Sequence, residues 1–277
     1  MELTTDIAKL QRIAKEIRYG IVKTVGEAGA GHIGGAMGMA DIFTALYFSI
    51  LKHNPKKPEW SERDRLLLSN GHICPVLYTS LAKTNYFDPI LLKKFCTISS
   101  PLQCHPHLKS IPGVENTSGS LGQGLSQACG LALSYKMDNK DNRVFCITSD
   151  AEHQEGQIWE AYMFALKYKL NNLVNIIDRN SIQISGTMNN VMPLNRLKDK
   201  LVSFAWYVFE IDGHNFSEIL AALNKAKQVK DRPSVIIAHT IAGKGVSFME
   251  NNYKWHKKNL SKKQLKQALA ELMPETK

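Results

Sequence analysis

Apolar positions along this chain form either helically spaced stripes or short continuous runs, and the order of the two predicts alternating helices and strands. Over residues 7–25, apolar side chains return every three or four positions, which predicts an amphipathic first helix. Short apolar runs bounded by polar turns predict buried strands at 66–68, 143–150, 173–180, 207–211 and 234–240. Further helices are expected at 39–51, after SNGH as far as Ala82, and at 89–95, 121–137, 157–168, 194–204, 216–229 and 261–272.

This alternation predicts an α/β fold, a doubly wound and mostly parallel sheet with helices on both faces. The chain of 277 residues is long enough to bury a large core. It has no internal repeat, low-complexity tract or clear linker, so a single domain over 1–277 is expected. Residues 99–120 predict a long irregular loop, and loops of that length are often functional.

Charge changes this picture little. The net charge is +10, which is compatible with acidic or phosphorylated partners. No RNP-like motif, zinc finger or basic heptad accompanies the charge, so we expect a solvated basic surface and no nucleic-acid binding. The excess is densest near the C-terminal end, at Lys254, Lys257, Lys258, Lys262, Lys263 and Lys266.

The cysteines and the lengths of the apolar runs indicate the cellular compartment and whether the chain enters a membrane. Five scattered cysteines without a C-x-x-C pair predict reduced thiols in a cytoplasmic protein and no disulfide framework. The start, MELTTDIAKLQ, has no apolar signal core. No apolar run approaches the length of a membrane span, so no membrane partner is expected.

Polar side chains stand where two predicted strands end. Asp150 closes one strand, and Asp178 and Asn180 close the next. Ligands of such sheets bind outside the carboxyl ends of the strands, and oxygen ligands of this kind suit Mg²⁺. The glycine-rich turns GSLGQG and GHIGG each open a helix, where backbone N–H groups can face an anion. Together these features predict a Mg²⁺–diphosphate site.

The motifs, taken in order, resemble a known family. GHIGG, SNGH, HPH, PGVE, GSLGQG, SDAEHQEG, DRNSIQISG, IDGH, IAGKGVSFMEN and WH follow the N-terminal half of transketolase. The chain is most similar to the short N-terminal subunit of transketolases that are split into two chains. The resemblance runs from about Ile7 to His256.

The resemblance implies a domain that binds thiamine diphosphate and Mg²⁺, for which Ca²⁺ or Mn²⁺ can substitute. The metal ligands that it implies are Asp150, the Asn180 side chain and the Ile182 carbonyl. The cofactor-binding positions that it implies are His72, Gly119, Ser120, Leu121, Asp150, Ala151, Glu155, Gly156 and Asn180.

Catalytic roles are also implied by the resemblance. His32, His105 and His256 match histidines that handle the hydroxyls of the donor sugar and its proton transfers. Glu155 also matches a glutamate at a twofold interface that links two active sites. No role is assigned to Glu152 or His153.

The family implies the reaction and the partners. Transketolase moves a two-carbon ketol unit between sugar phosphates in the pentose phosphate pathway. The glutamate that faces the cofactor's aminopyrimidine, and most arginines that hold the sugar phosphate, belong to the other half of the enzyme. We therefore expect this chain to be inactive alone, to pair with a transketolase C-terminal subunit, and to self-associate across a twofold axis.

Two departures and two alternatives stand beside this interpretation. Ser149-Asp150-Ala151 replaces the usual Gly-Asp-Gly, which predicts weaker cofactor binding. Lys257 follows His256 where glycine is usual, which bears on the pose of His256. The alternatives are a subunit similar to 1-deoxy-D-xylulose-5-phosphate synthase, which uses pyruvate, and a non-catalytic subunit with a degraded cofactor site.

Overall fold

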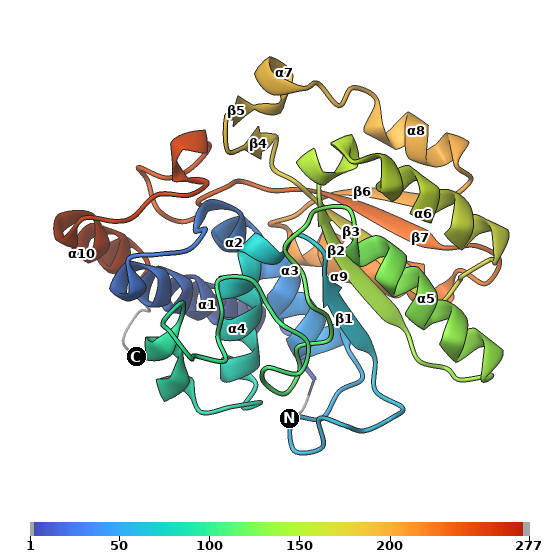
Figure 1. The fold of residues 1–277 in the computed structure, drawn as a ribbon, viewed down its shortest axis with the longest axis horizontal. Coiled ribbons are helices and arrows are strands. Elements are labelled where there is room, and N and C mark those ends of the chain that lie inside the picture. Colours follow the sequence, from blue (N-terminus) through green and yellow to red (C-terminus); the bar gives the residue numbers. More distant parts are fainter. Residues whose placement is uncertain (1–2, 274–277) are drawn as a thin grey trace.

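Five parallel strands form the central sheet of this computed structural model, which describes residues 3–273 (Figure 1). All four pairings in the sheet are parallel, as predicted for a doubly wound fold. The strands lie in the order β1 (Arg65–Leu68), β2 (Val144–Ser149), β3 (Leu173–Arg179), β7 (Ser234–His239) and β6 (Tyr207–Asp212).

Helices cover both faces of the sheet, which confirms the predicted fold class (Figure 1). Alternate residues of β2 divide between two cores: Phe145 and Ile147 enter the larger one, and Val144 and Cys146 the smaller. Both faces of the strand are therefore apolar. The larger core is covered by α1 (Ile7–Ala28), α2 (Gly34–Gly38), α3 (Ala40–Ala45), α4 (Cys74–Lys83), α9 (Phe216–Gln228) and α10 (Lys262–Glu271). The smaller core is covered by α5 (Gly124–Met137), α6 (Gly156–Lys167) and α8 (Leu197–Ser203).

Short elements complete the described chain. A two-stranded antiparallel sheet joins β4 (Ile182–Gln183) to β5 (Gly186–Thr187), and α7 (Met188–Val191) follows it. The 3₁₀ turns are η2 (Gly71–Ile73), η3 (Pro89–Lys94), η4 (Ala151–Gln154) and η5 (Tyr253–Trp255).

The first helix has both of its ends fixed by local chemistry. The Asp6 side chain accepts a hydrogen bond from the Lys9 N–H at 3.1 Å and caps the first turn. Gly29 ends the helix in the left-handed region, with φ 61°. The chain therefore turns sharply into the GHIGG segment.

Several predicted helices differ from those observed: the one expected at 194–204 is shorter, that at 89–95 is 3₁₀, and two further differences have local causes. The helix expected at 39–51 divides into α3 and a π-helical turn, η1 (Leu46–Ile50), in which the Leu51 N–H donates to the Leu46 carbonyl. The helix expected from Leu121 begins at Gly124, because Gly122 takes φ +81° and keeps the preceding residues in a turn.

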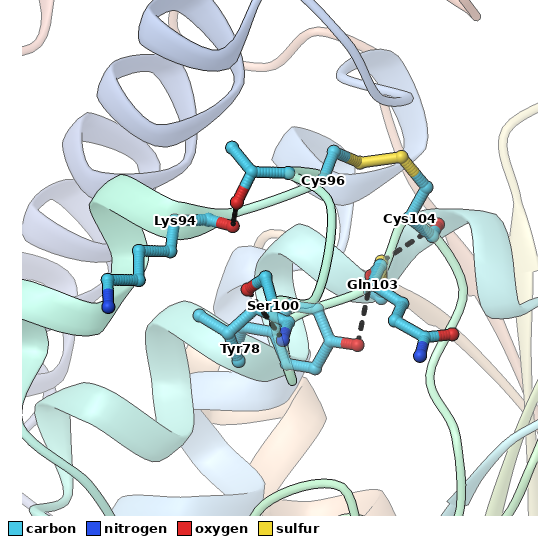
Figure 2. The surroundings of a disulfide bond; sticks show 9 residues. Tyr78, Lys94, Cys96, Ser100, Gln103 and Cys104 are labelled. Carbon is cyan, nitrogen blue, oxygen red and sulfur yellow. Dashed lines mark hydrogen bonds between the residues drawn. A yellow bond between two sulfur atoms is a disulfide. The ribbon is translucent and has the colours of Figure 1, made fainter.

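The prediction that all cysteines are reduced is wrong for two of them. A disulfide joins Cys96 and Cys104, whose Cα atoms lie 5.0 Å apart (Figure 2). The loop after η3 folds back through a hydrogen bond from the Cys96 N–H to the Leu102 carbonyl at 2.9 Å. That reversal brings the two side chains together. Cys74, Cys129 and Cys146 are free and buried.

Two other expectations concern the chain as a whole. No helix within residues 3–273 is both long and apolar enough to span a membrane. The single domain over 1–277 stays a prediction, and its two ends lie outside the described residues.

Candidate functional site

Two parallel strands end side by side at the candidate metal site. β2 and β3 pair so that Ser149 lies beside Asp178, and Asp150 and Asn180 follow the two strand ends. Asp150 is fully buried, and its Oδ2 accepts a hydrogen bond from the Ser181 N–H at 2.7 Å. This contact ties the end of β2 to the turn that follows β3.

The Asn180 amide is oriented by its neighbours. Its Nδ2 donates to Asp178 Oδ2 at 2.8 Å, and its Oδ1 accepts from the Ile182 N–H at 2.9 Å. The other Asp178 oxygen accepts from the Thr240 hydroxyl. Since an amide oxygen has two lone pairs, Asn180 Oδ1 keeps one for a further ligand.

The electrostatics at this corner of the sheet suit a divalent cation. Burial raises the pKa of Asp150 to about 6. Burial, and then the charge of Asp150, raise the pKa of Asp178 to about 7. The Arg179 Nη1 lies 3.8 Å from Asp150 Oδ2. The guanidinium therefore lies near only one of the two buried carboxyl groups, and a bound cation would supply further positive charge beside them.

The types of side chain at the site indicate which kind of metal ion it could bind. Within residues 3–273, no group of three or more His, Cys, Asp or Glu side chains could hold an ion. The strand-end site instead offers carboxylate and amide oxygens, which hard cations such as Mg²⁺ prefer. The residues present thus fit Mg²⁺ better than a transition metal.

Four histidines from separate segments meet at one place. The His32 ring centroid lies 5.1 Å from that of His72, 6.0 Å from that of His105 and 5.4 Å from that of His256. The His72 and His256 centroids are 5.1 Å apart. His72 lies within η2 and His256 directly follows η5, whereas His32 and His105 lie in irregular segments, so it is the fold that brings the four together.

Burial keeps these imidazoles neutral. Burial, with smaller contributions from His256, His105 and Lys257, lowers the pKa of His32 to about 4. Burial also lowers the pKa values of His72, His105 and His256. A neutral imidazole presents one donor and one acceptor nitrogen. Within the described chain, His32 Nδ1 is buried without a hydrogen-bond partner and is free for a ligand.

The histidines and the strand ends open on the same pocket, with a cavity volume of about 290 Å³. All but three of the residues expected in the site line it; Ser120, Asp150 and Gly156 do not. Asp150 lies buried behind its neighbours Ser149 and Ala151. The lining residues are His32, Gly35, His72, His105, Gly119, Leu121, Ser149, Ala151, Gln154, Glu155, Asn180, Ile182, Gln183, Ile184 and His256.

The departure from Gly-Asp-Gly costs no backbone strain. Ala151 opens the 3₁₀ turn η4, and within the described residues neither it nor Ser149 has positive φ. Its N–H donates to Asp150 Oδ1 at 2.8 Å. The Ala151 side chain lines the pocket, so the replacement of glycine changes only the space available there.

The turn that precedes α5 leaves room for a ligand. A Cβ added at Gly119 or at Gly156 would meet no atom within 4 Å. The Leu121 carbonyl accepts from Gln157 Nε2 at 3.1 Å, which ties this turn to the start of α6. The helix α6 begins at Gly156 with no side-chain cap, so its first N–H groups are left for another acceptor.

Helix α2 holds the segment that carries His256. A Cβ on Gly34 would lie 3.0 Å from the Trp255 carbonyl oxygen, and one on Gly38 would lie 2.9 Å from the Ile241 carbonyl oxygen. The Gly243 N–H donates to the Gly34 carbonyl at 2.8 Å. These main-chain contacts place His256 and do not involve the Lys257 side chain.

Glu152 has a structural task that the sequence did not reveal. It is fully buried and accepts hydrogen bonds from the Ser69 hydroxyl, the Gly122 N–H at 2.6 Å and the Ser149 N–H at 3.1 Å. It therefore joins the end of β1, the turn before α5 and the end of β2. Two of its partners lie 83 and 30 residues away, so no local pattern marks the position.

The remaining histidines lie outside the pocket lining. His153 is buried between the Ser149 carbonyl and the Tyr162 hydroxyl, each 2.8 Å away. His214 Nδ1 lies 2.7 Å from Asp41 Oδ2, and its Nε2 accepts from the Ile241 N–H at 2.8 Å. The contacts of both are structural.

Comparison with known proteins agrees with this geometry. Residues 9–275 match the family described as transketolase, thiamine diphosphate binding domain. A Clostridium sp. protein named 6-deoxy-6-sulfo-D-fructose transketolase subunit SqwG is 42% identical, over 96% of this chain and 97% of that one. A protein from Phocaeicola vulgatus, named as one subunit of an apulose-4-phosphate transketolase, is 37% identical, over 96% and 94%.

Longer relatives match over part of their length. Human transketolase is 34% identical over 96% of this chain and 43% of that protein. The crystal structure of Campylobacter jejuni transketolase has a TM-score of 0.90 at 34% identity, over 98% of this chain and 44% of that one. Fold, motif order and sequence similarity thus agree, and the chain belongs to the family of transketolase thiamine diphosphate-binding domains.

Proposed function

We propose that this chain is the cofactor-binding subunit of a two-chain transketolase, which transfers a two-carbon ketol unit between sugar phosphates with thiamine diphosphate and Mg²⁺. The observation that carries the proposal is the pocket that the four histidines share with the strand-end oxygen donors. Two relatives of nearly the same length are named as transketolase subunits, which supports the division into two chains.

The strand-end residues would hold the cofactor. Asp150, Asn180 Oδ1 and the Ile182 carbonyl would bind Mg²⁺, with Ca²⁺ or Mn²⁺ as substitutes. The main chain at Gly119 and Leu121, together with Ser120, His72, Ala151, Glu155 and Gly156, would surround the diphosphate and its ring system. When bound, thiamine diphosphate supplies a thiazolium carbon that acts as nucleophile and electron sink.

The histidines would move the protons of the sugar. Because burial holds His32, His105 and His256 neutral, each can accept a proton from a sugar hydroxyl at one nitrogen. The opposite nitrogen can donate a hydrogen bond to a second oxygen. Their closeness lets three groups act on adjacent hydroxyls of one substrate.

The proposed partners complete the site. A separate transketolase C-terminal subunit would bring the carboxylate that faces the aminopyrimidine and the basic groups that hold the sugar phosphate. Self-association across a twofold axis would place Glu155, which is exposed at the pocket, in the interface. A cytoplasmic location would give access to sugar phosphates, and cell fractionation would test it.

The test is ketol transfer by this chain alone and after mixing with the C-terminal subunit. Donors would be fructose 6-phosphate, xylulose 5-phosphate, apulose 4-phosphate and 6-deoxy-6-sulfofructose, which the names of similar proteins suggest. Activity is expected only in the mixture, and full activity of the chain alone would refute the two-chain proposal.

Matched variants test the cofactor site. Asp150→Asn should abolish Mg²⁺-dependent binding of thiamine diphosphate by the assembled complex, measured by calorimetry. Asp138→Asn, on an exposed residue at the end of α5, should bind as the unaltered protein does. Binding by neither the variants nor the unaltered complex would favour a non-catalytic subunit. Turnover of pyruvate in place of a ketose donor would favour a 1-deoxy-D-xylulose-5-phosphate synthase.

A further inference from the structure

The Cys96–Cys104 disulfide closes a short loop directly before His105 (Figure 2). The two residues are 8 apart in sequence, and both are partly exposed. Cys104 also lines a second pocket, of about 270 Å³, together with His32, His105 and Lys257. A small molecule in that pocket would therefore lie beside Cys104 and two of the clustered histidines.

Few other contacts hold the end of this loop. Phe95 and Leu102 are fully buried and anchor its base. Nearer His105, the Gln103 carbonyl accepts from the Tyr78 hydroxyl at 3.0 Å (Figure 2). The Cys104 carbonyl accepts from Cys74 Sγ at 3.2 Å. A thiol is a weak donor, and the Pro106 carbonyl, which accepts from the Ser118 N–H at 3.1 Å, lies on the other side of His105. The covalent bond is therefore the strongest restraint on the segment that precedes His105.

The backbone of the loop also favours release when the bond opens. Cys96 has φ 55° and Ser99 has φ 61°, both in the left-handed region that residues with a Cβ disfavour. The disulfide and the hydrogen bond from the Cys96 N–H to the Leu102 carbonyl both join Cys96 to the far side of the loop. Without the bond, the segment from Thr97 to Ser99, which is exposed, can relax to ordinary backbone angles.

We propose that Cys96 and Cys104 form a reversible redox site whose disulfide fixes the loop that carries His105, and whose reduction loosens it. The consequence for catalysis rests on the proposed transketolase function, whereas the redox chemistry and the change in the loop do not. The three buried cysteines take no part, because neither oxidant nor reductant reaches them.

The chemistry needs a peroxide or a small disulfide as oxidant and a thiol as reductant. With hydrogen peroxide, one thiolate attacks the O–O bond to give a sulfenic acid and water; the second thiol then displaces a second water and forms the S–S bond. The two sulfurs together lose two electrons and two protons. In the reverse direction, two molecules of glutathione exchange in turn, release both thiols and leave as glutathione disulfide.

Peptide mapping tests the redox step directly. Trypsin should release residues 95–109, a peptide that contains Cys96, Cys104 and no further cysteine. After peroxide treatment and alkylation of free thiols, this peptide should be lighter by two hydrogen atoms and carry no alkyl group. After glutathione treatment, the same peptide should carry two alkyl groups. Peptides with Cys74, Cys129 and Cys146 should be alkylated equally in both samples, once unfolded. A pair that stays reduced under peroxide, or resists glutathione, would overturn the proposal.

Histidine labelling tests the loop without any assay of catalysis. Diethyl pyrocarbonate should label His105 about threefold or more faster in the reduced protein, because the loosened loop opens more often. His107 lies in the same tryptic peptide and is exposed already, so its rate is the internal control. Equal labelling of His105 in the two redox states would show that the bond does not fix the loop.

A variant links the bond to the active complex. Cys96→Ser removes the bond but leaves Cys104 at the pocket, and it should label like the reduced protein under any redox condition. Cys129→Ala removes a buried free thiol and should still respond to oxidant. In the complex, Cys96→Ser should lower kcat/KM about tenfold, since small misplacements of a catalytic group have large effects. If the complex shows no ketol transfer, labelling still decides the redox proposal. Activity that is identical in both redox states would refute the link to catalysis.

Discussion

Replacing Glu152 by glutamine should destabilise the chain, although the side chain keeps nearly the same size and shape. Its carboxylate accepts from three donors: the Ser69 hydroxyl and the Gly122 N–H at Oε1, and the Ser149 N–H at Oε2. Glutamine can keep the first two bonds with its oxygen, but its NH₂ group then faces the Ser149 N–H. One buried donor is left without an acceptor.

The magnitude follows from that single mismatch. A lost hydrogen bond to a charged group is worth about 1.5–3 kcal/mol. Burial raises the pKa of Glu152, so the folded state bears a penalty for the carboxylate that glutamine removes. We therefore expect Glu152→Gln to lower the free energy of unfolding by about 2 kcal/mol. With a urea slope of about 3 kcal/mol/M, the midpoint should fall by about 0.7 M.

Urea unfolding of the isolated chain, followed by far-UV circular dichroism, measures this effect. Glu160→Gln is the control, because Glu160 lies exposed on the same helix that follows the site, and it should change the free energy by less than about 0.5 kcal/mol. Glu152→Ala leaves all three donors without this acceptor and should lower the free energy of unfolding by about 4 kcal/mol. A Glu152→Gln midpoint equal to that of Glu160→Gln would refute the reasoning that the carboxylate joins the three segments.

Other substitutions probe other parts of the structure. Gly29→Ala should lower the free energy of unfolding by about 1–2 kcal/mol in urea, because Gly29 has φ 61°, which a residue with a Cβ disfavours. No atom lies within 4 Å of the added Cβ, so a steric clash does not contribute. Gly130→Ala, at an exposed helical position equally free of neighbours, should instead raise it by about 0.5–1 kcal/mol; a loss at both would point to sterics. Burial lowers the pKa of His153 from 6.5 to about 4, so folding excludes its proton. The resulting contribution to the free energy of unfolding, about 3 kcal/mol, is fully present above pH 6.5 and is lost as the pH falls toward 4. His153→Gln should therefore show a flatter dependence of unfolding free energy on pH. An unchanged slope would contradict the lowered pKa. Ala151→Gly should tighten thiamine diphosphate binding by less than about tenfold in calorimetry, because only space is gained; a larger gain would indicate backbone strain.

The architecture could be predicted because its causes are local. Helically spaced apolar residues predict α1, and short apolar runs predict the five strands. The polar residues after β2 and β3 must meet because parallel strands end on one edge. The candidate cation corner of Asp150 and Asn180 follows from that rule alone. The start of α5 was placed too early because its position depends on the φ of Gly122, which the apolar pattern does not encode.

Long-range contacts account for what could not be predicted. The meeting of His32, His72, His105 and His256 was expected only through family resemblance, since no spacing relates turns on different segments. The partners of Glu152 depend on the same tertiary arrangement. The Cys96–Cys104 bond depends on how one loop reverses, and a spacing of eight residues is no signature of a disulfide.

The glycines of α2 imply that tolerance to mutation is unevenly divided across the site. Because Gly34 and Gly38 receive the main chain of residues 241–255, any side chain on α2 at these positions displaces the whole segment. The segment itself is held by main-chain contacts with α2 and by the buried side chains of Val246, Met249 and Trp255, whereas Lys257 is exposed. A library of random substitutions, selected for folded protein, should therefore be depleted at Gly34 and Gly38 and permissive at Lys257. Lys257 can accordingly stand where glycine is usual, and sequence drift around His256 can alter the rim of the pocket without moving the histidine.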